Sequence, residues 1–324
     1  MRLAINGFGR IGRTVLRQIL ARPLGDIEVA LINDIATGEM CAHLFQYDST
    51  YGPYPEAVGF EAGVLSVGAR QFALHQCDDL SQLPLDGVDV VLECTGIART
   101  SDVARRGLAA GARKVLISGP SVAAELSVVL GANEHSLNDQ RVVSNGSCTT
   151  NAVAVLAAVL DQVAGIERAH MTTIHCYTNS QPMVDAPRGD LARSRAGALS
   201  MVPTTTSAMH LVDDVLPALA GRISGAAVRV PTASVSAVDM VAQLRAPLDV
   251  AALRAAIAAS DVLGWTEAPL VSSDLRARAE SLIVAGPETR LMGTQARVFG
   301  WYDNEWGFGA RMLDVARLMA NGAP

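Results

Sequence analysis

Short apolar runs alternate with amphipathic stretches along the first half of the chain. The run RLAIN (residues 2–6) is almost wholly apolar, as expected for a strand buried on both faces of a sheet. The stretch TVLRQILAR that follows has the spacing of an amphipathic helix. Further strand-like runs are IEVALIND (27–34), VDVVLECTG (88–96), KVLIS (114–118), SVVLGAN (127–133) and RVVSNGS (141–147), and helical stretches such as SDVARRGLAAGA separate some of them. This alternation predicts a doubly wound parallel sheet.

The pattern changes after an alanine-rich helical stretch at 151–165. The strand-like runs there are longer and partly alternate between apolar and polar positions, at 169–179, 224–230 and 233–247, with a last strand and turn at 297–308. Helical spacing returns at 247–260 and 310–322. Long strands facing a layer of helices predict an α+β domain with a mostly antiparallel sheet covered on one side. We therefore expect a first domain at 1–147, a second at 148–308, and a C-terminal helix (309–324) that packs back on the first domain.

Composition and charge narrow the classes of function. The 324 residues suffice for two domains of roughly 100–200 residues each, and 50% of them are hydrophobic. The net charge of −6 without a basic run argues against nucleic acid or an anionic membrane surface as a partner. No apolar stretch approaches the ~20 residues of a membrane span, and the start lacks a signal-peptide pattern, so we expect a cytoplasmic protein. The five cysteines are odd in number and lack CxxC spacing, which predicts neither a disulfide framework nor a metal site.

A glycine-rich turn joins the first strand to the first helix. Gly7, Gly9 and Gly12 form the pattern G-x-G-x-x-G, and Asp34 ends the next strand. The glycines permit a tight turn and close approach of a pyrophosphate to a helix N-terminus. The carboxylate of Asp34 would accept both adenine-ribose hydroxyls and repel a 2′-phosphate, which favours NAD over NADP. The alternative is a glycine-rich turn without a ligand.

Two further turns should line the cofactor crevice, because ligands bind at the carboxyl ends of parallel strands. They are the turn at Thr95 and Gly96 and the turn at Ser118. Ordinary connecting turns are the alternative interpretation for each.

The stretch SNGSCTTN (144–151) places Cys148 among small polar residues at the start of a helix, where a thiolate is stabilised. A buried structural thiol is the commoner role of a free cysteine. After the strand that follows, a long loop carries Arg188, Arg193 and Arg195 among many hydroxyl residues. Loops of this length are usually functional, and such groups suit a phosphate ester. A solvated subunit-contact loop is the alternative.

Taken together, these motifs resemble those of glyceraldehyde-3-phosphate dehydrogenases, a glycolytic family, and of the related erythrose-4-phosphate dehydrogenases. The similarity runs nearly from end to end, through INGFGRIGR, SCTTN, TTIH with a following TNSQ turn, PTTT, VRVPT and WYDNEWG. The resemblance implies a Rossmann domain followed by an α+β catalytic domain, an NAD-dependent aldehyde dehydrogenase activity, and a homotetramer.

The resemblance also implies a covalent mechanism. Cys148 would attack the aldehyde as a thiolate, with a pKa lowered well below 7 by the helix and a neighbouring imidazole. His175 would be that imidazole and the general base. The Cys148 backbone N–H and His175 would hold the oxyanion. Hydride transfer to NAD leaves a thioester, which inorganic phosphate resolves. The implied reaction is reversible oxidative phosphorylation of glyceraldehyde 3-phosphate to 1,3-bisphosphoglycerate.

The resemblance also implies the remaining binding residues, each at the position that matches the family's motif. Arg10 and Ile11 match backbone contacts to the pyrophosphate, and Asn304 matches the residue that binds the nicotinamide carboxamide. The substrate-phosphate site maps to Thr178, Ser180 and Arg229. The inorganic-phosphate site maps to Ser147, Thr149, Thr206 and the adjoining Ser207, with Arg195 as the associated loop arginine.

Several positions depart from the family pattern. Among them, Ser207 replaces a glycine, His210 a lysine, Pro182 a basic residue, and Ala98 a phenylalanine that flanks adenine. These changes surround the anion and cofactor sites, so three alternatives stay open. One is a non-phosphorylating erythrose-4-phosphate dehydrogenase, in which water resolves the thioester. The second is a specialised paralogue acting on another phosphorylated aldehyde, and the third is an NAD-binding protein without catalysis.

Overall fold

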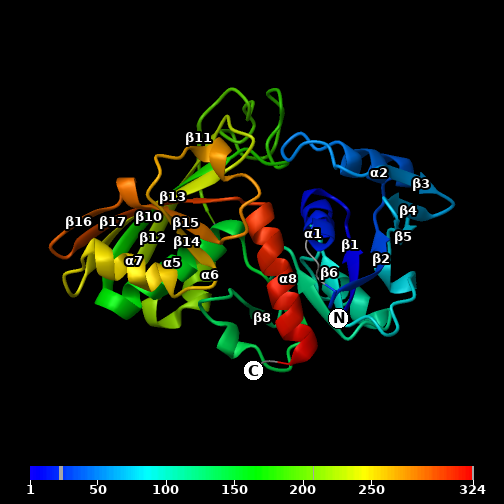
Figure 1. The fold of residues 1–324 in the computed structure, drawn as a ribbon, viewed down its shortest axis with the longest axis horizontal. Coiled ribbons are helices and arrows are strands. Elements are labelled where there is room, and N and C mark those ends of the chain that lie inside the picture. Colours follow the sequence, from blue (N-terminus) through cyan, green and yellow to red (C-terminus); the bar gives the residue numbers. More distant parts are fainter. Residues whose placement is uncertain (22–24, 207, 323–324) are drawn as a thin grey trace. The chain divides into compact units, whose positions relative to one another are not determined.

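The computed structural model describes residues 1–21, 25–206 and 208–322, and the predicted site residue Ser207 lies outside them. The chain forms two compact units (Figure 1). The first comprises Met1–Val128, Glu134–Gly146 and the chain from Gly309 onward, and the second comprises Val129–Asn133 and Ser147–Phe308. Ser147, placed in the first domain by the sequence-based boundary, therefore groups with the second unit.

The first unit is built on a nine-stranded sheet of order β3-β4-β5-β2-β1-β6-β7-β9-β8. Its strands are β1 (Arg2–Asn6), β2 (Glu28–Asn33), β3 (Val58–Glu61), β4 (Val64–Val67), β5 (Arg70–His75), β6 (Val90–Glu93), β7 (Lys114–Ile117), β8 (Leu126–Ser127) and β9 (Val142–Ser144). Its helices are α1 (Arg10–Ala21), α2 (Gly38–Gln46), α3 (Ser101–Ala104) and α4 (Arg106–Ala109), with short 3-10 helices at Leu80–Gln82 and Glu134–Ser136.

The pairing from β5 through β8 is parallel throughout, which confirms the predicted doubly wound sheet. All four residues of β6 are buried, as continuous apolar runs require. Two parts of the first unit differ from the sequence-based prediction. The strands β3, β4 and β5 were not predicted, and the antiparallel β3 and β4 extend the sheet beyond β5. The predicted strand at 127–133 is wrong beyond Ser127, because the Val129 N–H bonds to the side chain of Asn133 and closes a turn.

The second unit contains an eight-stranded sheet with main order β11-β12-β10-β13-β17-β15-β14, and β16 pairs with β17. Its strands are β10 (Ile166–Cys176), β11 (Val202–Thr204), β12 (Ile223–Val230), β13 (Ser236–Leu244), β14 (Leu263–Thr266), β15 (Leu282–Ala285), β16 (Arg290–Met292) and β17 (Gln295–Tyr302). Its helices are α5 (Cys148–Ala164), α6 (Ala208–Val215) and α7 (Val250–Ala258), with 3-10 helices at Pro217–Leu219, Ser272–Leu275 and Gly286–Glu288.

This second sheet is mostly antiparallel, as predicted, with parallel pairs only at β10–β12 and β14–β15 among the described strands. One face packs on α5, whose Val153, Leu156 and Leu160 are buried against residues such as Met240 of β13. That core fixes the position of α5 relative to the end of β10. The catalytic residues predicted from sequence lie at those two places.

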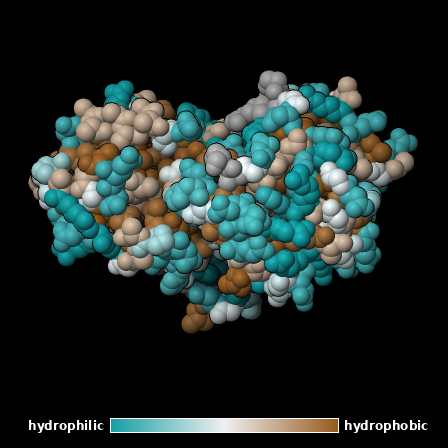
Figure 2. All heavy atoms as spheres, turned by 90° about the horizontal axis from the view of Figure 1, so that it is seen from below, coloured by the Kyte–Doolittle hydropathy of each residue, from teal (hydrophilic) through white to brown (hydrophobic). Residues whose placement is uncertain are grey.

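The last helix, α8 (Trp306–Asn321), groups with the first unit from Gly309 onward. A Cβ at Gly309 would lie 2.8 Å from the Gln18 side chain of α1, so the two helices approach closely. No helix within the described residues has the length and apolar character needed to cross a bilayer. On the face drawn in Figure 2, hydrophilic residues predominate and hydrophobic residues lie among them.

Candidate active site

Cys148 is the first residue of helix α5. Ser147 caps this helix, since its hydroxyl accepts the Thr150 N–H at 3.0 Å. Gly146 before it has a φ of +63°, which turns the chain from β9 into the helix. The thiol therefore lies in the first helical turn, where the helix dipole favours negative charge.

His175 lies near the end of β10 and is only 5% exposed. Its Nε2 is 3.5 Å from the Cys148 Sγ, and its Nδ1 is 2.7 Å from the Cys176 carbonyl oxygen. Arg229 Nη1, which can only donate, also lies 3.0 Å from Nδ1. The contact with the carbonyl oxygen is shorter, and that oxygen only accepts, so we assign the proton to Nδ1. Nε2 is then the unprotonated nitrogen that faces the thiol. This tautomer is the one that a general base requires.

The protonation states follow from burial. Burial, and secondly the nearby Arg229 guanidinium, lowers the pKa of His175 to about 4, so the imidazole is neutral at pH 7. Burial also raises the pKa of the Cys148 thiol, although Arg229 opposes this. The chain by itself therefore holds a thiol beside a neutral imidazole. The expectation of a Cys148 pKa well below 7 is therefore wrong for the chain without ligands. The helix and the imidazole favour the thiolate, but burial of the sulfur disfavours it more strongly.

Tyr302, at the end of β17, supports this pair and was not singled out from the sequence. Its hydroxyl bonds to the hydroxyls of Thr149 (2.9 Å) and Thr173 (2.8 Å), and its ring meets the His175 ring edge-on at 6.0 Å between centroids. Burial raises the pKa of Tyr302, which keeps the phenol neutral. The tyrosine thereby ties the first turn of α5 to β10. Tyr302 could have been chosen from the sequence because it belongs to the WYDNEWG motif.

A cationic and hydroxyl-bearing cluster adjoins His175. Arg229 of β12 donates from Nη1 to the Cys176 carbonyl oxygen (3.1 Å) and to Thr178 Oγ1 (3.3 Å). Thr178 Oγ1 lies 2.9 Å from Ser180 Oγ. The structure thus brings together all three residues that the sequence assigned to the substrate phosphate. One guanidinium and two hydroxyls form an anion site of favourable chemistry.

The residues predicted for inorganic phosphate do not form one hydrogen-bonded group, as those predicted for the substrate phosphate do. The Thr149 hydroxyl is buried against Tyr302, and Thr206 Oγ1 accepts the N–H of Ala208 at the start of α6. The guanidinium of Arg195 pairs with Asp185 at 2.7 Å, and the Arg195 side chain is 64% exposed.

Arg193 occupies the place expected for Arg195. Its Nε donates to Thr204 Oγ1 at 2.5 Å, and its Nη2 donates to the Thr205 carbonyl oxygen (3.2 Å) and hydroxyl (3.3 Å). These threonines directly precede Thr206 in the PTTT segment. The sequence showed three arginines in one loop, and spacing alone could not tell which of them reaches this segment.

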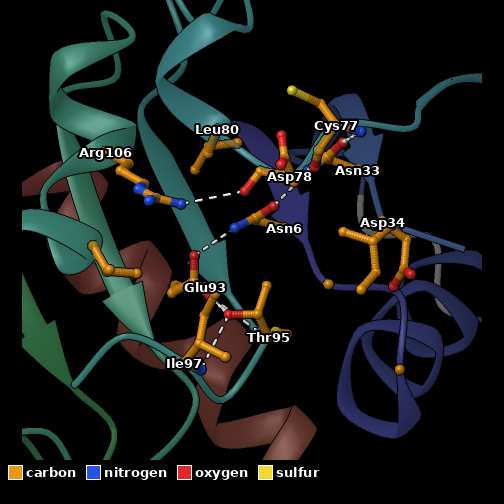
Figure 3. Close-up of a pocket in the computed structure, with 15 residues that line it drawn as sticks. Asn6, Asn33, Asp34, Cys77, Asp78, Leu80, Glu93, Thr95, Ile97 and Arg106 are labelled. Carbon is orange, nitrogen blue, oxygen red and sulfur yellow. Dashed lines mark hydrogen bonds between the residues drawn. The ribbon is translucent and has the colours of Figure 1, made fainter. Parts of the chain in front are cut away.

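In the first unit, a pocket of about 260 Å³ lies at the carboxyl ends of the parallel strands (Figure 3). Gly7 has a φ of +91°, and a Cβ there would lie 2.7 Å from the Cys94 carbonyl carbon. A Cβ at Gly12 would lie 2.2 Å from the Gly7 carbonyl oxygen, whereas Gly9 has nothing within 4 Å. Two of the glycines are therefore required by packing, and Gly9 leaves room for a ligand beside the first turn of α1. Arg10 and Ile11 form that turn.

The acidic group of this pocket is fixed in place. Asp34 Oδ2 accepts the Phe8 N–H at 2.6 Å, and Oδ1 accepts the Ala36 N–H at 2.8 Å. Thr95 also lines the pocket, whereas Gly96 (φ +76°) and Ser118 stand in the adjoining turns. Ala98 is buried and does not line the pocket; its neighbour Ile97 does. An anchored carboxylate, a glycine turn and a helix start fit a dinucleotide.

Asn304 lies in the second unit and is nearly buried. Its Oδ1 accepts from Cys176 Sγ at 3.1 Å and from Ser236 Oγ at 3.4 Å. Burial raises the pKa of Cys176 to about 12, so this thiol is a hydrogen-bond donor and not a second nucleophile. The Cys176 Sγ also lies 3.9 Å from His175 Nδ1.

Comparison with known proteins identifies the family. Residues 1–101 match the model for the glyceraldehyde 3-phosphate dehydrogenase NAD binding domain, and residues 147–304 match that for the C-terminal domain. The chain is 44% identical over 329 residues to the glyceraldehyde-3-phosphate dehydrogenase of Xanthobacter flavus, covering 98% of each chain. It is 45% identical over 328 residues to that of Pseudomonas aeruginosa, covering 99% of this chain and 98% of the relative. It is 42% identical over 331 residues to glyceraldehyde-3-phosphate dehydrogenase 1 of Streptomyces arenae, covering 99% of each. The chain therefore belongs to the glyceraldehyde-3-phosphate dehydrogenase family and is an NAD-dependent oxidoreductase.

Proposed function

We propose that the protein catalyses the reversible, NAD-dependent oxidative phosphorylation of glyceraldehyde 3-phosphate to 1,3-bisphosphoglycerate. The observation that carries the proposal is the pairing of Cys148 with the unprotonated Nε2 of His175, 3.5 Å away, beside the Arg229 cluster. A thiol, a base and an anion site at this spacing suit a phosphorylated aldehyde.

The first step is attack on the aldehyde. His175 Nε2 takes the Cys148 proton as the sulfur bonds to the carbonyl carbon. The backbone N–H of Cys148 and the imidazolium of His175 hold the developing oxyanion, which His175 then protonates to give a thiohemiacetal. The hydrogen bond from Nδ1 to the Cys176 carbonyl oxygen keeps the ring in the required orientation throughout.

The second step is oxidation followed by phosphorolysis. NAD, when bound, supplies the hydride acceptor. His175 takes the hydroxyl proton of the thiohemiacetal as the carbon is oxidised, which leaves a thioester on Cys148. Inorganic phosphate attacks that thioester, the acyl phosphate leaves, and the Cys148 sulfur recovers its proton from His175.

The binding roles follow the chemistry of each group. We assign the substrate phosphate to Thr178, Ser180 and Arg229. We assign inorganic phosphate to Ser147, Thr149 and Thr206, with Arg193 in place of Arg195. The cofactor residues are Gly7, Gly9, Arg10, Ile11, Gly12, Asp34, Thr95, Gly96 and Ser118 in the first unit, with Asn304 for the carboxamide.

The test is NADH formation from glyceraldehyde 3-phosphate and from erythrose 4-phosphate, each with and without inorganic phosphate. Turnover that requires both the triose and phosphate is the expected result. Phosphate-independent turnover of the tetrose would instead assign the chain to the related dehydrogenases. Normal NAD binding with no turnover of either would leave another phosphorylated aldehyde, or loss of catalysis.

A further inference from the structure

A buried carboxylate lies beneath the first-unit pocket, and no step above uses it. Glu93, the last residue of β6, is 3% exposed, yet it lines the pocket together with Asp34 and Thr95 (Figure 3). An ionised carboxylate buried in this way requires hydrogen-bond donors around it. Its partners therefore indicate what it does.

Each oxygen of Glu93 has donors of its own. Oε2 accepts the Asn6 side-chain amide at 2.5 Å, and Oε1 accepts the Thr95 N–H at 3.0 Å and also the Thr95 hydroxyl. The Thr95 hydroxyl in turn accepts the Ile97 N–H at 3.3 Å, so its own proton points to Glu93. Three donors thus converge on one carboxylate. Burial raises the pKa of Glu93, and these hydrogen bonds oppose the rise.

The hydrogen bonds continue across the sheet from Asn6. Asn6 Oδ1 accepts the Asn33 amide at 2.8 Å. The same amide also donates to the Cys77 carbonyl oxygen at 2.9 Å, and Asn33 Oδ1 accepts the Cys77 N–H at 3.0 Å. The carboxyl ends of β6, β1 and β2 and the chain just beyond β5 are therefore joined in one network. All five residues line the pocket.

We propose that Glu93 is a positioning residue for NAD, which sets the Thr95 turn and the Asn6–Gly7 turn in the geometry that the cofactor requires. Asn6 directly precedes the first glycine of the turn, and Thr95 is the cofactor-side residue of the next turn. An isolated loop would leave these groups free to move, whereas the carboxylate holds both at once. The inference rests on the proposal that this pocket receives the cofactor, but it is independent of which aldehyde is oxidised.

The experiment measures the NAD dissociation constant by calorimetry, kcat at saturating NAD, and the thermal unfolding midpoint. In Glu93→Gln the new side-chain N–H₂ must face either the Asn6 amide or the Thr95 groups, which are themselves donors. We therefore expect NAD to bind at least about tenfold more weakly. We expect kcat at saturating NAD to stay within about twofold, because the second-unit residues are unchanged. Asn6→Asp sets two carboxylates against each other and should weaken NAD binding at least as much.

The double variant Asn6→Asp with Glu93→Gln distinguishes positioning from a general loss of packing. It restores every bond, because the new carboxylate at position 6 would accept both the Asn33 amide and the new amide at position 93. The amide oxygen at position 93 would in turn accept from Thr95. We expect the NAD affinity of this variant to return to within about threefold of the wild type. Additive weakening in the double variant would overturn the proposal, because independent sites add and coupled ones do not.

Asp89→Asn is the matched control. Asp89 immediately precedes β6, at the amino end of this strand, whereas Glu93 lies at its carboxyl end. Asp89 accepts the Arg2 N–H at 2.8 Å. It should lower the unfolding midpoint without changing NAD affinity. If Glu93→Gln has a lower unfolding midpoint and normal NAD affinity, as expected for the control, the proposal is also overturned.

If Glu93→Gln does not fold, Thr95→Val (hydroxyl lost) is compared with Thr95→Ser (hydroxyl kept). Weaker NAD binding in Thr95→Val alone supports the proposal, and equal binding in both contradicts it. Asp34→Ala checks separately that NAD enters this pocket, since wild-type affinity in that variant would contradict the pocket assignment itself.

Discussion

At the scale of single residues, burial determines the chemistry of the catalytic pair. A solvent-exposed histidine titrates near pH 6.5, but the buried ring of His175 has its pKa lowered to about 4. The hydrogen bond from Nδ1 to the Cys176 carbonyl oxygen then leaves Nε2 as the base. A neutral base of fixed tautomer is therefore available without any change in structure.

This burial makes stability depend on pH. The folded-state pKa of His175 lies below its unfolded value, so the unfolded chain binds more protons and folding loses free energy as pH falls from about 6.5 toward 4. At pH 5 the loss from this one group is about 2 kcal/mol. Urea unfolding at pH 7 and pH 5 should show it as a difference between the wild type and His175→Asn. Equal pH dependence of the two proteins would mean that the imidazole is not buried as described.

The loop arginines give a second test at this scale. Arg193 contacts Thr204 and Thr205, whereas Arg195 is exposed and paired with Asp185. We expect Arg193→Ala to raise the KM for inorganic phosphate by about tenfold or more, the effect of losing a charge-assisted hydrogen bond. Arg195→Ala should change it by no more than about twofold. The reverse order of effects would restore the role to Arg195.

At the scale of elements, the glycines that precede and begin α1 have different roles. A Cβ at Gly12 would meet the Gly7 carbonyl oxygen, but one at Gly9 would meet nothing. Gly12→Ala should therefore lower the free energy of unfolding by about 1–3 kcal/mol, the usual cost of overpacking. Gly9→Ala should leave stability unchanged and weaken NAD binding by filling ligand space. Calorimetric unfolding and NAD titration check both, and a Gly12→Ala protein as stable as the wild type would refute this packing.

The elements also show what the sequence could predict. Continuous apolar runs identified β1, β2, β6 and β7, and the small polar residues around Cys148 indicated the start of α5. The strands β3, β4 and β5 were missed because they are only partly buried, so that none of them forms a continuous apolar run. The motifs singled out Cys148, His175 and Arg229, and the structure brings these three side chains together. Tyr302 and Glu93 were missed because their contacts join elements far apart in the sequence. Arg193 was named only as one of three loop arginines, because spacing does not show which of them reaches Thr204 and Thr205.

At the scale of the whole molecule, the long loop exposes large apolar residues. Met183, Val184, Leu191, Leu199 and Met201 are each largely exposed on the single chain. Exposed apolar side chains concentrated in one segment indicate a protein interface. We propose that the chain assembles as a homotetramer with this loop at subunit contacts. Sedimentation equilibrium should give four times the chain mass of 33.9 kDa, and a monomer at micromolar concentration would contradict the assignment.

The covalent role of Cys148 is tested most directly by trapping the thioester. The enzyme is incubated with glyceraldehyde 3-phosphate and NAD without inorganic phosphate, quenched in acid, digested and analysed by mass spectrometry. We predict an acyl adduct on the peptide that contains Cys148, absent in Cys148→Ser and lost when phosphate is added before quenching. NADH formation without any adduct on Cys148, or with the adduct on another cysteine, would contradict the proposed mechanism.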